Sequence, residues 1–228
     1  MKSGLKIKVI PVKVLFFIMI LSVPVLFFGL SLNLYSDENP DVIKSWDTIK
    51  IPPAPELKSV KADPKTTALL LLDFNKQTCN AEKRPRCISS IPKMKKILKE
   101  ARAKGVTVIY SLSPGASADD ISKELTPLKN EPVVTSGPDK FFGTDLEKIL
   151  KDRNIQTVIV TGTAAHGAVI YTASGAALRG MLVIVPVDGL SAESLYPEQY
   201  TIWHLVNAPR VSAKVTLTRL DTLKFDAK

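Results

Sequence analysis

The stretch "TVIVTGTAAHGAVIYTASGAALRG", from Thr157 to Gly180, decides the fold of this chain. It begins with an apolar run of the length of a buried strand, and a turn of small residues follows. The remainder, "HGAVIYTASGAALRG", predicts a helix that ends at Gly180. A buried strand joined to a helix by a short turn is the repeating unit of a parallel sheet, so this stretch predicts an α/β fold.

The same alternation continues on both sides of this stretch. Further strands are predicted at 66–73, 106–111, 131–136, 181–189 and 213–218, and further helices at 91–104, 143–154 and 196–207. The first of these strands, "TTALLLLD", is apolar throughout, which is typical of a strand buried on both faces. We therefore expect a three-layer Rossmann-like fold with a mainly parallel sheet of about six strands and helices on both faces.

The chain has 228 residues, which is enough for one well-cored domain after its ends are set aside. We expect this globular domain at 66–220. Residues 36–65 are rich in Pro, Asp and Lys without a sustained period, which predicts a linker or extended arm. Residues 221–228 are expected to form a C-terminal tail.

Residues 1–35 are predicted to be a signal peptide or an N-terminal membrane anchor, because four lysines precede an uncharged apolar run at 14–32. The run is long for a signal-peptide core and near the roughly 20 residues that span a bilayer. No small-x-small cleavage site follows it, which favours an uncleaved anchor over a signal peptide and over a buried core helix. The lysines precede the run, so the domain is expected to be exported, periplasmic or extracellular, and held at the membrane if the segment is uncleaved.

The formal net charge of +9 includes those four lysines, and the rest of the positive charge is spread along the chain. The densest basic run, "KMKKILKEARAK", places Ile97, Leu98 and Ala101 at helical spacing. Such a pattern is typical of the solvated face of a helix rather than of a phosphate-binding patch. We therefore expect no nucleic-acid partner.

The two cysteines, Cys79 and Cys87, lie in the polar stretch "CNAEKRPRC". In an oxidising compartment a pair this close predicts a disulfide that closes and stiffens a short loop. Free thiols and a metal-binding pair are the alternatives. The spacing is unusual for a metal site, and only His166 and His204 could complete one, so we expect no bound metal and no cofactor.

Ligands of parallel sheets bind at the carboxyl ends of the strands, and this rule selects candidates for chemistry. Asp73 ends the first buried strand, where partial burial would raise the pKa of its carboxyl group and suit it to general acid/base work. A carboxylate that merely caps the following turn is the alternative. The other residues at this predicted edge are Ser111, Ser113, Asp188 and the stretch from Thr135 to Lys140.

The turn "TGTAAHGAV" links a strand to a helix through small residues, so its backbone can approach a ligand closely. N–H groups near a helix N-terminus suit an oxyanion or carboxylate, and the expected binding residues are Thr163, Ala164, Ala165, Gly167 and Ala168. The turn is neither a dinucleotide fingerprint nor a P-loop. Tight strand-to-helix packing is the alternative. His166 is a candidate proton carrier or substrate donor, or else a histidine that caps the helix.

Four stretches together carry a family resemblance: "LLLLDFN", "FFGTDLEKILKDRNIQTVIVTG", "GTAAHGAVIYTASGAALRG" and "VIVPVDGLSAES". In these the chain resembles the isochorismatase-like hydrolases, whose cysteine members include nicotinamidases. The resemblance covers most of the chain from Thr66 to about Thr218. It implies a small-molecule substrate and a homo-oligomer.

The resemblance also implies roles for individual residues. In the cysteine members, the acid that matches Asp73 works with a lysine and with a cysteine, at whose position this chain has Ala168. The turn before that cysteine carries a cis peptide, here expected at about Ala164 to Ala165, and its amides form the oxyanion hole. True isochorismatases also lack the cysteine, share the "AH" of this turn, and cleave a vinyl ether with the matching aspartate as the acid. Ala168 therefore excludes thiol catalysis only.

The family's lysine is expected near Thr135, whereas this chain has its lysine at Lys140, in "TSGPDKFFG". Lys140 reaches the site only if the loop takes a different path, and a surface lysine is the alternative. We expect a hydrolase of a small, anionic substrate that uses acid/base chemistry, with Asp73, Lys140 and His166 as candidate catalytic residues. The alternative is a catalytically inactive relative that binds a small molecule or serves as a membrane-associated scaffold.

Overall fold

A computed structural model describes residues 41–226 of the chain. The chain divides at Pro52 into two units, and the described part of the first contains a short 3₁₀ helix, η1 (Trp46–Thr48). The predicted apolar segment at 14–32 lies outside the described residues. Within residues 41–226, none of the helices combines the length and apolar character that a bilayer crossing requires. All other elements belong to the second unit, Pro53–Lys228.

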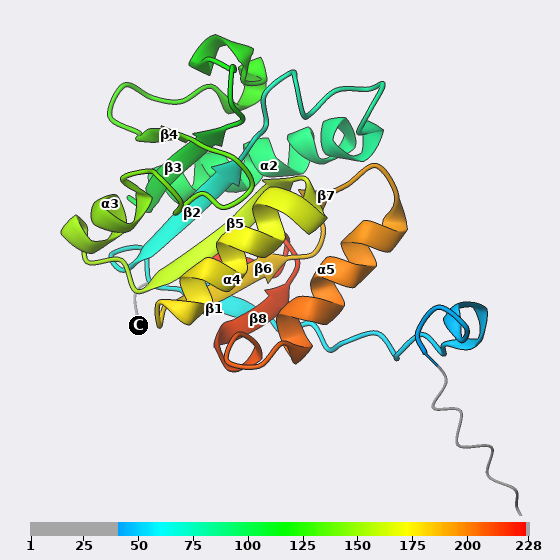
Figure 1. The fold of residues 1–228 in the computed structure, drawn as a ribbon. Coiled ribbons are helices and arrows are strands. Elements are labelled where there is room, and N and C mark those ends of the chain that lie inside the picture. The colour runs from blue at the N-terminus through cyan, green and yellow to red at the C-terminus, as the bar shows by residue number, and fades with distance from the viewer. Residues whose placement is uncertain (1–40, 227–228) are drawn as a thin grey trace, which may run out of the picture. The chain divides into compact units, whose positions relative to one another are not determined.

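The core of this second unit is a parallel sheet of seven strands (Figure 1). Its order is β4-β3-β2-β5-β6-β8, and β7 pairs with the end of β5. The α/β fold expected from the sequence is thus confirmed, with seven strands in place of about six. The bounds are β2 (Thr67–Leu72), β3 (Thr107–Leu112), β4 (Val133–Thr135), β5 (Thr157–Thr163), β6 (Leu182–Pro186), β7 (Leu190–Ser191) and β8 (Val215–Thr218). The additional strand, β7, has only two residues, too few to carry a periodic pattern.

Helices cover both faces of the sheet. Figure 1 shows α4 (Ile170–Leu178) and α5 (Leu195–Asn207) side by side on one face and α2 (Pro85–Ala103) on the other. The short helix α3 (Leu146–Asp152) packs into the same core cluster as α4 and α5. The helix α2 begins before the predicted start at Ile91, since Pro85 suits the first turn of a helix, where its missing N–H costs nothing.

The connections carry short helical turns. These are η2 (Ala118–Asp120), η3 (Lys123–Leu125), η4 (Ala165–Val169) and η5 (Ser212–Lys214). The element η4 is a turn of π-helix that joins the end of β5 to α4. It therefore occupies the position of the small-residue turn singled out in the sequence.

A second, two-stranded parallel sheet pairs β1 (Val60–Ala62) with β9 (Leu223–Phe225). These strands fall within the stretches expected to form the linker and the C-terminal tail. Ala62, Leu223 and Phe225 are buried in the core cluster on the α2 side of the main sheet. Each strand has three residues, so neither shows an alternation that sequence reasoning could use.

The central strands are buried along their whole length, and this fixes the edge where a site can form. All six residues of β2 are buried, and Leu72 at its end pairs with Ser111 on one side and Gly162 on the other. Gly162 has φ 123°, and a Cβ there would lie 2.0 Å from the carbonyl oxygen of Leu72. Only glycine permits this close approach of β5 to β2, immediately before Asp73 and Thr163.

Candidate active site

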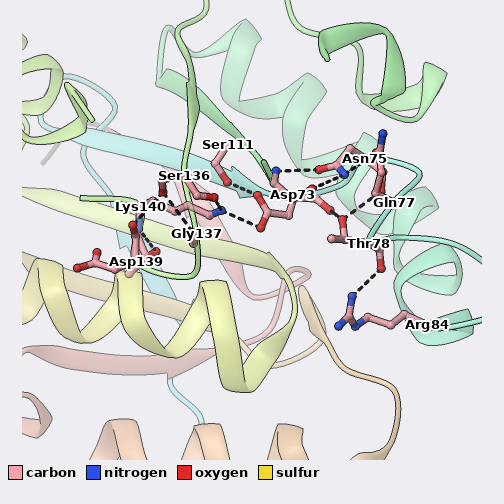
Figure 2. Close-up of polar contacts among 12 residues, drawn as sticks. Asp73, Asn75, Gln77, Thr78, Arg84, Ser111, Ser136, Gly137, Asp139 and Lys140 are labelled. Atoms are coloured by element: carbon pink, nitrogen blue, oxygen red, sulfur yellow. Dashed lines mark hydrogen bonds and ion pairs between the residues drawn. The ribbon is translucent and has the colours of Figure 1, made fainter. Parts of the chain in front are cut away.

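Asp73 and Lys140 form a buried ion pair at the carboxyl edge of the sheet (Figure 2). Asp73 follows β2 directly, and Lys140 lies in the loop between β4 and α3. Lys140 Nζ is 2.8 Å from Asp73 Oδ2. Lys140 is 0% exposed and Asp73 is 5% exposed, so both charges are removed from solvent. The structure thus directs Lys140 to the site and not to the surface.

The loop that carries Lys140 is held by hydrogen bonds at several points. Lys140 Nζ also donates to the backbone oxygen of Ser136 at 3.1 Å, and the Lys140 backbone N–H donates to Thr172 Oγ1 of α4 at 3.4 Å. Thr144 Oγ1 donates to the Lys140 backbone oxygen at 2.5 Å. Thr135, where the family pattern places its lysine, is an exposed residue at the end of the edge strand β4. The loop after Thr135 passes through Gly137 and brings Lys140, not Thr135, into the site.

The carboxylate of Asp73 has a defined partner on each oxygen. Ser111 Oγ donates to Oδ1 at 2.7 Å, and Lys140 holds Oδ2. The Asp73 backbone N–H donates to the Ser111 backbone oxygen, while its own backbone oxygen accepts from Thr78 Oγ1 at 2.5 Å. Asp73 adopts φ 53°, a left-handed conformation that aspartate tolerates better than most residues.

Burial is the largest influence on the pKa of Asp73 and raises it above the ordinary value of 3.8. Lys140 and Ser111 oppose this effect, because a positive charge and a donated hydrogen bond both favour the ionised form. The net direction is upward. Asp73 is therefore easier to protonate than an aspartate in water, which suits it to take up and return a proton.

The turn after β5 lies beside this pair in the fold and carries the predicted anion-binding residues. The cis peptide joins Thr163 to Ala164, one bond earlier than expected. Thr163 Oγ1 donates to the backbone oxygen of Ser191 at 3.1 Å. The backbone oxygen of Ala164 accepts from the N–H groups of Gly167 and Val169, at 3.0 Å and 3.2 Å. The amide of Gly167, one of the expected oxyanion donors, is therefore already engaged within the turn.

Ala168 is 3% exposed, so its methyl group is packed and not directed to solvent. The chain has two cysteines, and the structure joins Cys79 to Cys87 in a disulfide with a Cα–Cα distance of 5.4 Å. With both sulfurs bonded, the chain has no thiolate that could act as a nucleophile.

His166 lies at the periphery of the site. Its side chain is 39% exposed, and Nε2 is 3.6 Å from Glu193 Oε1, which is beyond hydrogen-bond distance. Within the described part of the chain, His166 makes no hydrogen bond to Asp73 or Lys140. The structure therefore brings Asp73 and Lys140 together and leaves His166 outside their contact.

Two other residues selected by the strand-end rule have separate partners. Ser113 Oγ accepts from Asn75 Nδ2 at 3.0 Å. Figure 2 shows Asn75 on the side of Asp73 that faces away from Lys140. Asp188 binds Lys93 Nζ at 2.9 Å and the Leu220 backbone N–H at 2.9 Å. Among the described residues, neither Ser113 nor Asp188 forms a hydrogen bond or ion pair with the Asp73 carboxylate.

One cation near the site was missed by the sequence reasoning. Arg84 lies within the loop closed by the disulfide, and its Nη1 donates to the Thr78 backbone oxygen at 3.0 Å. Its positive charge lowers the pKa of Asp73, although less than Lys140 does. The available signal was the position of "CNAEKRPRC" directly after the Asp73 strand. From the sequence, that stretch indicates a stiffened loop but does not indicate that the loop brings a positive charge near Asp73.

Among the residues that the structure describes, no cluster of three His, Cys, Asp or Glu side chains could hold a metal ion. The site that the described residues build is thus made of an ion pair, a hydroxyl and a small-residue turn.

Comparisons with known proteins identify the family to which this chain is similar. The model for the isochorismatase domain matches residues 67–218. N-carbamoylsarcosine amidase from an Arthrobacter species is 29% identical over 145 residues, which cover 51% of this chain and 55% of that enzyme. The chain thus spans about half the length of the curated relative that it matches.

Solved structures show the same fold. An isochorismatase family protein from Desulfovibrio vulgaris is 20% identical with a TM-score of 0.62, covering 69% of this chain and 95% of that one. N-carbamoylsarcosine amidase from Thermoplasma acidophilum is 24% identical with a TM-score of 0.59, covering 68% and 97%. These structures confirm the fold, and the match of residues 67–218 to the isochorismatase domain confirms the family resemblance stated from the sequence.

Proposed function

The chain belongs to the isochorismatase family, and we propose that it hydrolyses a small, anionic substrate by acid/base chemistry without a cysteine nucleophile. The observation that carries this proposal is the buried ion pair of Asp73 and Lys140, 2.8 Å apart at the carboxyl edge of the sheet. An acid, a fixed cation and a small-residue turn in one place are the parts that a hydrolytic site needs.

In this mechanism Asp73 acts as the proton donor. Burial raises the pKa of its carboxyl group, which increases the fraction that carries a proton near neutral pH. When Asp73 gives up its proton, the negative charge forms 2.8 Å from the ammonium of Lys140, which stabilises it. The neighbouring ammonium thus favours the step in which the proton leaves.

The absence of a thiol restricts the reactions that this site supports. An acyl-enzyme would require a nucleophilic side chain, and both sulfurs are bonded to each other. A vinyl ether needs none: protonation of its β-carbon gives an oxocarbenium ion, water adds to that ion, and the hemiketal releases an alcohol and a carbonyl compound. Direct attack of water on a polarised amide or carbamoyl carbonyl is the second reaction class, because two of the three similar proteins named above are N-carbamoylsarcosine amidases.

Substrate access requires a movement in this mechanism, because Lys140 is 0% exposed and Asp73 is 5% exposed. The segment between Ser136 and Thr144 is the part that would move. It contains Gly137 and Gly143, the latter at φ 68° with open space around its α-carbon. The hydrogen bonds from Lys140 Nζ to Ser136 and from Thr144 Oγ1 to Lys140 lie within this segment. Opening this segment would uncover the Asp73 carboxylate for the substrate, and its closure would return Lys140 to within 2.8 Å of Asp73 for the proton transfer.

The test is a substrate screen with the purified full-length chain. The panel contains N-carbamoyl amino acids, small amides, imides, anhydrides and vinyl ethers. Asp73→Asn should lower kcat/KM for any substrate found by about 100-fold or more, which is the usual contribution of a general acid. Asp152→Asn, an exposed aspartate of α3, is the matched control and should have wild-type activity. Turnover that persists in Asp73→Asn would refute the assignment of the acid.

The full burial of Lys140 also favours a second candidate, a catalytically inactive relative in which the ion pair is structural. Such a protein would bind a small molecule or serve as a scaffold at the membrane. It predicts no turnover on any compound of the panel, together with a strong loss of stability in Asp73→Asn. Turnover of any compound in the panel therefore distinguishes the first candidate from the second.

We further propose that the domain is exported and that residues 14–32 hold it at the membrane. The disulfide of Cys79 and Cys87 supports this, because such bonds persist mainly in oxidising compartments. Protease added to intact cells or spheroplasts should digest the domain, and carbonate extraction should leave an anchored chain in the membrane fraction. Digestion only after the cytoplasmic membrane is lysed would contradict export. A homo-oligomer stays a prediction from the family.

A further inference from the structure

The loop closed by the disulfide places a guanidinium group, that of Arg84, within electrostatic reach of Asp73. Cys79 and Cys87 are both buried, and Arg84 lies between them. Thr78 connects this loop to the site: its Oγ1 donates to the Asp73 backbone oxygen, and its own backbone oxygen accepts from Arg84 Nη1 at 3.0 Å. Figure 2 shows this chain of contacts from Asp73 through Thr78 to Arg84. Arg84 is therefore fixed with respect to Asp73.

Arg84 has donor capacity that the protein does not use. A guanidinium carries five N–H donors, and Arg84 Nε is buried with no hydrogen-bond acceptor among the described residues. The nearest carboxylate oxygen, Glu193 Oε2, lies 3.8 Å from Nε, which is too long for a hydrogen bond. An unsatisfied buried donor is costly, so this group gains when an anion reaches it.

Pairing with Glu193 does not by itself account for this arrangement. The Glu193 side chain is 48% exposed, and an ion pair of this length at a solvated position contributes little. Glu193 also faces His166 at 3.6 Å, so one carboxylate is shared between two cationic or potentially cationic groups at the rim of the site. The position beside Arg84 attracts a carboxylate but holds the resident one loosely.

We propose that Arg84 binds the carboxylate of the substrate, so that the substrate class is a small carboxylic acid whose hydrolysed bond reaches Asp73. The planar fork of arginine matches a carboxylate with two parallel hydrogen bonds, which lysine does not reproduce. Glu193 is then the competing anion that the substrate carboxylate displaces. This inference rests on the proposed function, since it names what the same site recognises.

The disulfide has a defined part in this recognition. It joins residues separated by 8 positions and so limits the conformations that the Arg84 loop can adopt. A binding group held in place beforehand loses less entropy when its ligand arrives. Reduction of the disulfide should therefore weaken carboxylate binding in the wild-type chain.

The experiment measures binding to the full-length chain by protein-observed NMR or calorimetry. The probes are small carboxylic acids, each paired with its own carboxamide, beginning with N-carbamoylglycine and N-carbamoylglycinamide. The wild-type chain should bind at least one acid about tenfold or more tightly than its amide, the size expected for charge-assisted hydrogen bonds. Arg84→Gln should remove that preference, and Glu193→Gln should increase it.

Lys83→Gln is the matched control, because it removes the same charge from an exposed neighbour in the same loop and should leave the preference intact. A thermal melt of each variant separates lost recognition from lost folding. An unchanged affinity for the carboxamide shows in addition that the rest of the binding site is intact. The inference is overturned if no acid of the panel binds more tightly than its amide, or if Arg84→Gln keeps the preference.

The two proposals fail separately. Asp73→Asn should lower kcat/KM by about 100-fold or more while the preference for the acid remains, because Arg84 is unchanged. A chain that prefers the acid but hydrolyses nothing would contradict the proposed function and support the role of Arg84. A chain that hydrolyses acid and amide equally well would support the proposed function and contradict the role of Arg84.

Discussion

Replacement of Lys140 by methionine tests the ion pair most directly. Methionine keeps much of the apolar stem of lysine and removes the charge, so the change leaves the Asp73 carboxylate without its cation. Both side chains are almost fully buried, and the two charged atoms are 2.8 Å apart. Loss of one partner from a buried pair costs about 3–5 kcal/mol. We expect Lys140→Met to lower the free energy of unfolding by that amount at neutral pH.

The loss should depend on pH in a direction that the Asp73 pKa fixes. Its folded pKa is raised above 3.8, so its contribution to stability is complete below that value and falls as the pH rises through the folded pKa. Lys140 is one of the groups that lower this pKa, and its removal raises the pKa further. Ionisation of Asp73 then costs more in the variant than in the wild type, so the difference between them should grow with pH.

The assay is urea denaturation followed by tryptophan fluorescence, at about pH 5 and about pH 8, for wild type and variant. Lys151→Met, on the exposed face of α3, is the matched control and should change stability little at either pH. The double variant Asp73→Asn/Lys140→Met completes a cycle that isolates the coupling of the pair. A loss below about 1 kcal/mol, the range of exposed pairs, would refute this account of the pair. So would a loss of equal size at both pH values.

Three further predictions concern the disulfide, the close strand contact and the acid. Replacing Cys79 and Cys87 together by serine should lower the free energy of unfolding by about 2–3 kcal/mol, and reductant should then have no further effect on the melt. Gly162→Ala should cost about 4 kcal/mol or more, because its Cβ would meet a backbone oxygen of β2; Gly180→Ala, which has open space, should cost about 1–2 kcal/mol in the same denaturation assay. For any substrate found, kcat/KM should fall as the pH rises through the raised pKa of Asp73, and a flat profile would exclude a protonated acid.

The fold was predictable because its strands are long apolar runs separated by helical patterns. The run at β2 is buried along its whole length, as its continuous apolar sequence indicated. The strands that escaped prediction have two or three residues, and their formation depends on partners far along the chain. Val60 pairs with Leu223, for example, and no local pattern records a contact of that separation.

The site was predictable in part, for a related reason. Asp73 could be selected because the end of a buried parallel strand has a known place in the fold. Lys140 could only be proposed, since its approach depends on the path of an irregular loop, and hydrogen bonds such as that from its Nζ to Ser136 decide that path. Arg84 was missed because its position depends on the disulfide and on the contact with Thr78, neither of which has a periodic signature.

The arrangement around Asp73 also indicates which oxygen carries the proton. Lys140 Nζ has only donors, so Oδ2 cannot be protonated while the ammonium remains beside it. Ser111 is different, because a hydroxyl donates to an ionised Oδ1 and, after rotation, accepts from a protonated one. The protonated and ionised forms of Asp73 can therefore both keep two hydrogen-bond partners. A serine at this position thus lets a buried carboxyl group change its protonation state without leaving a polar atom unsatisfied.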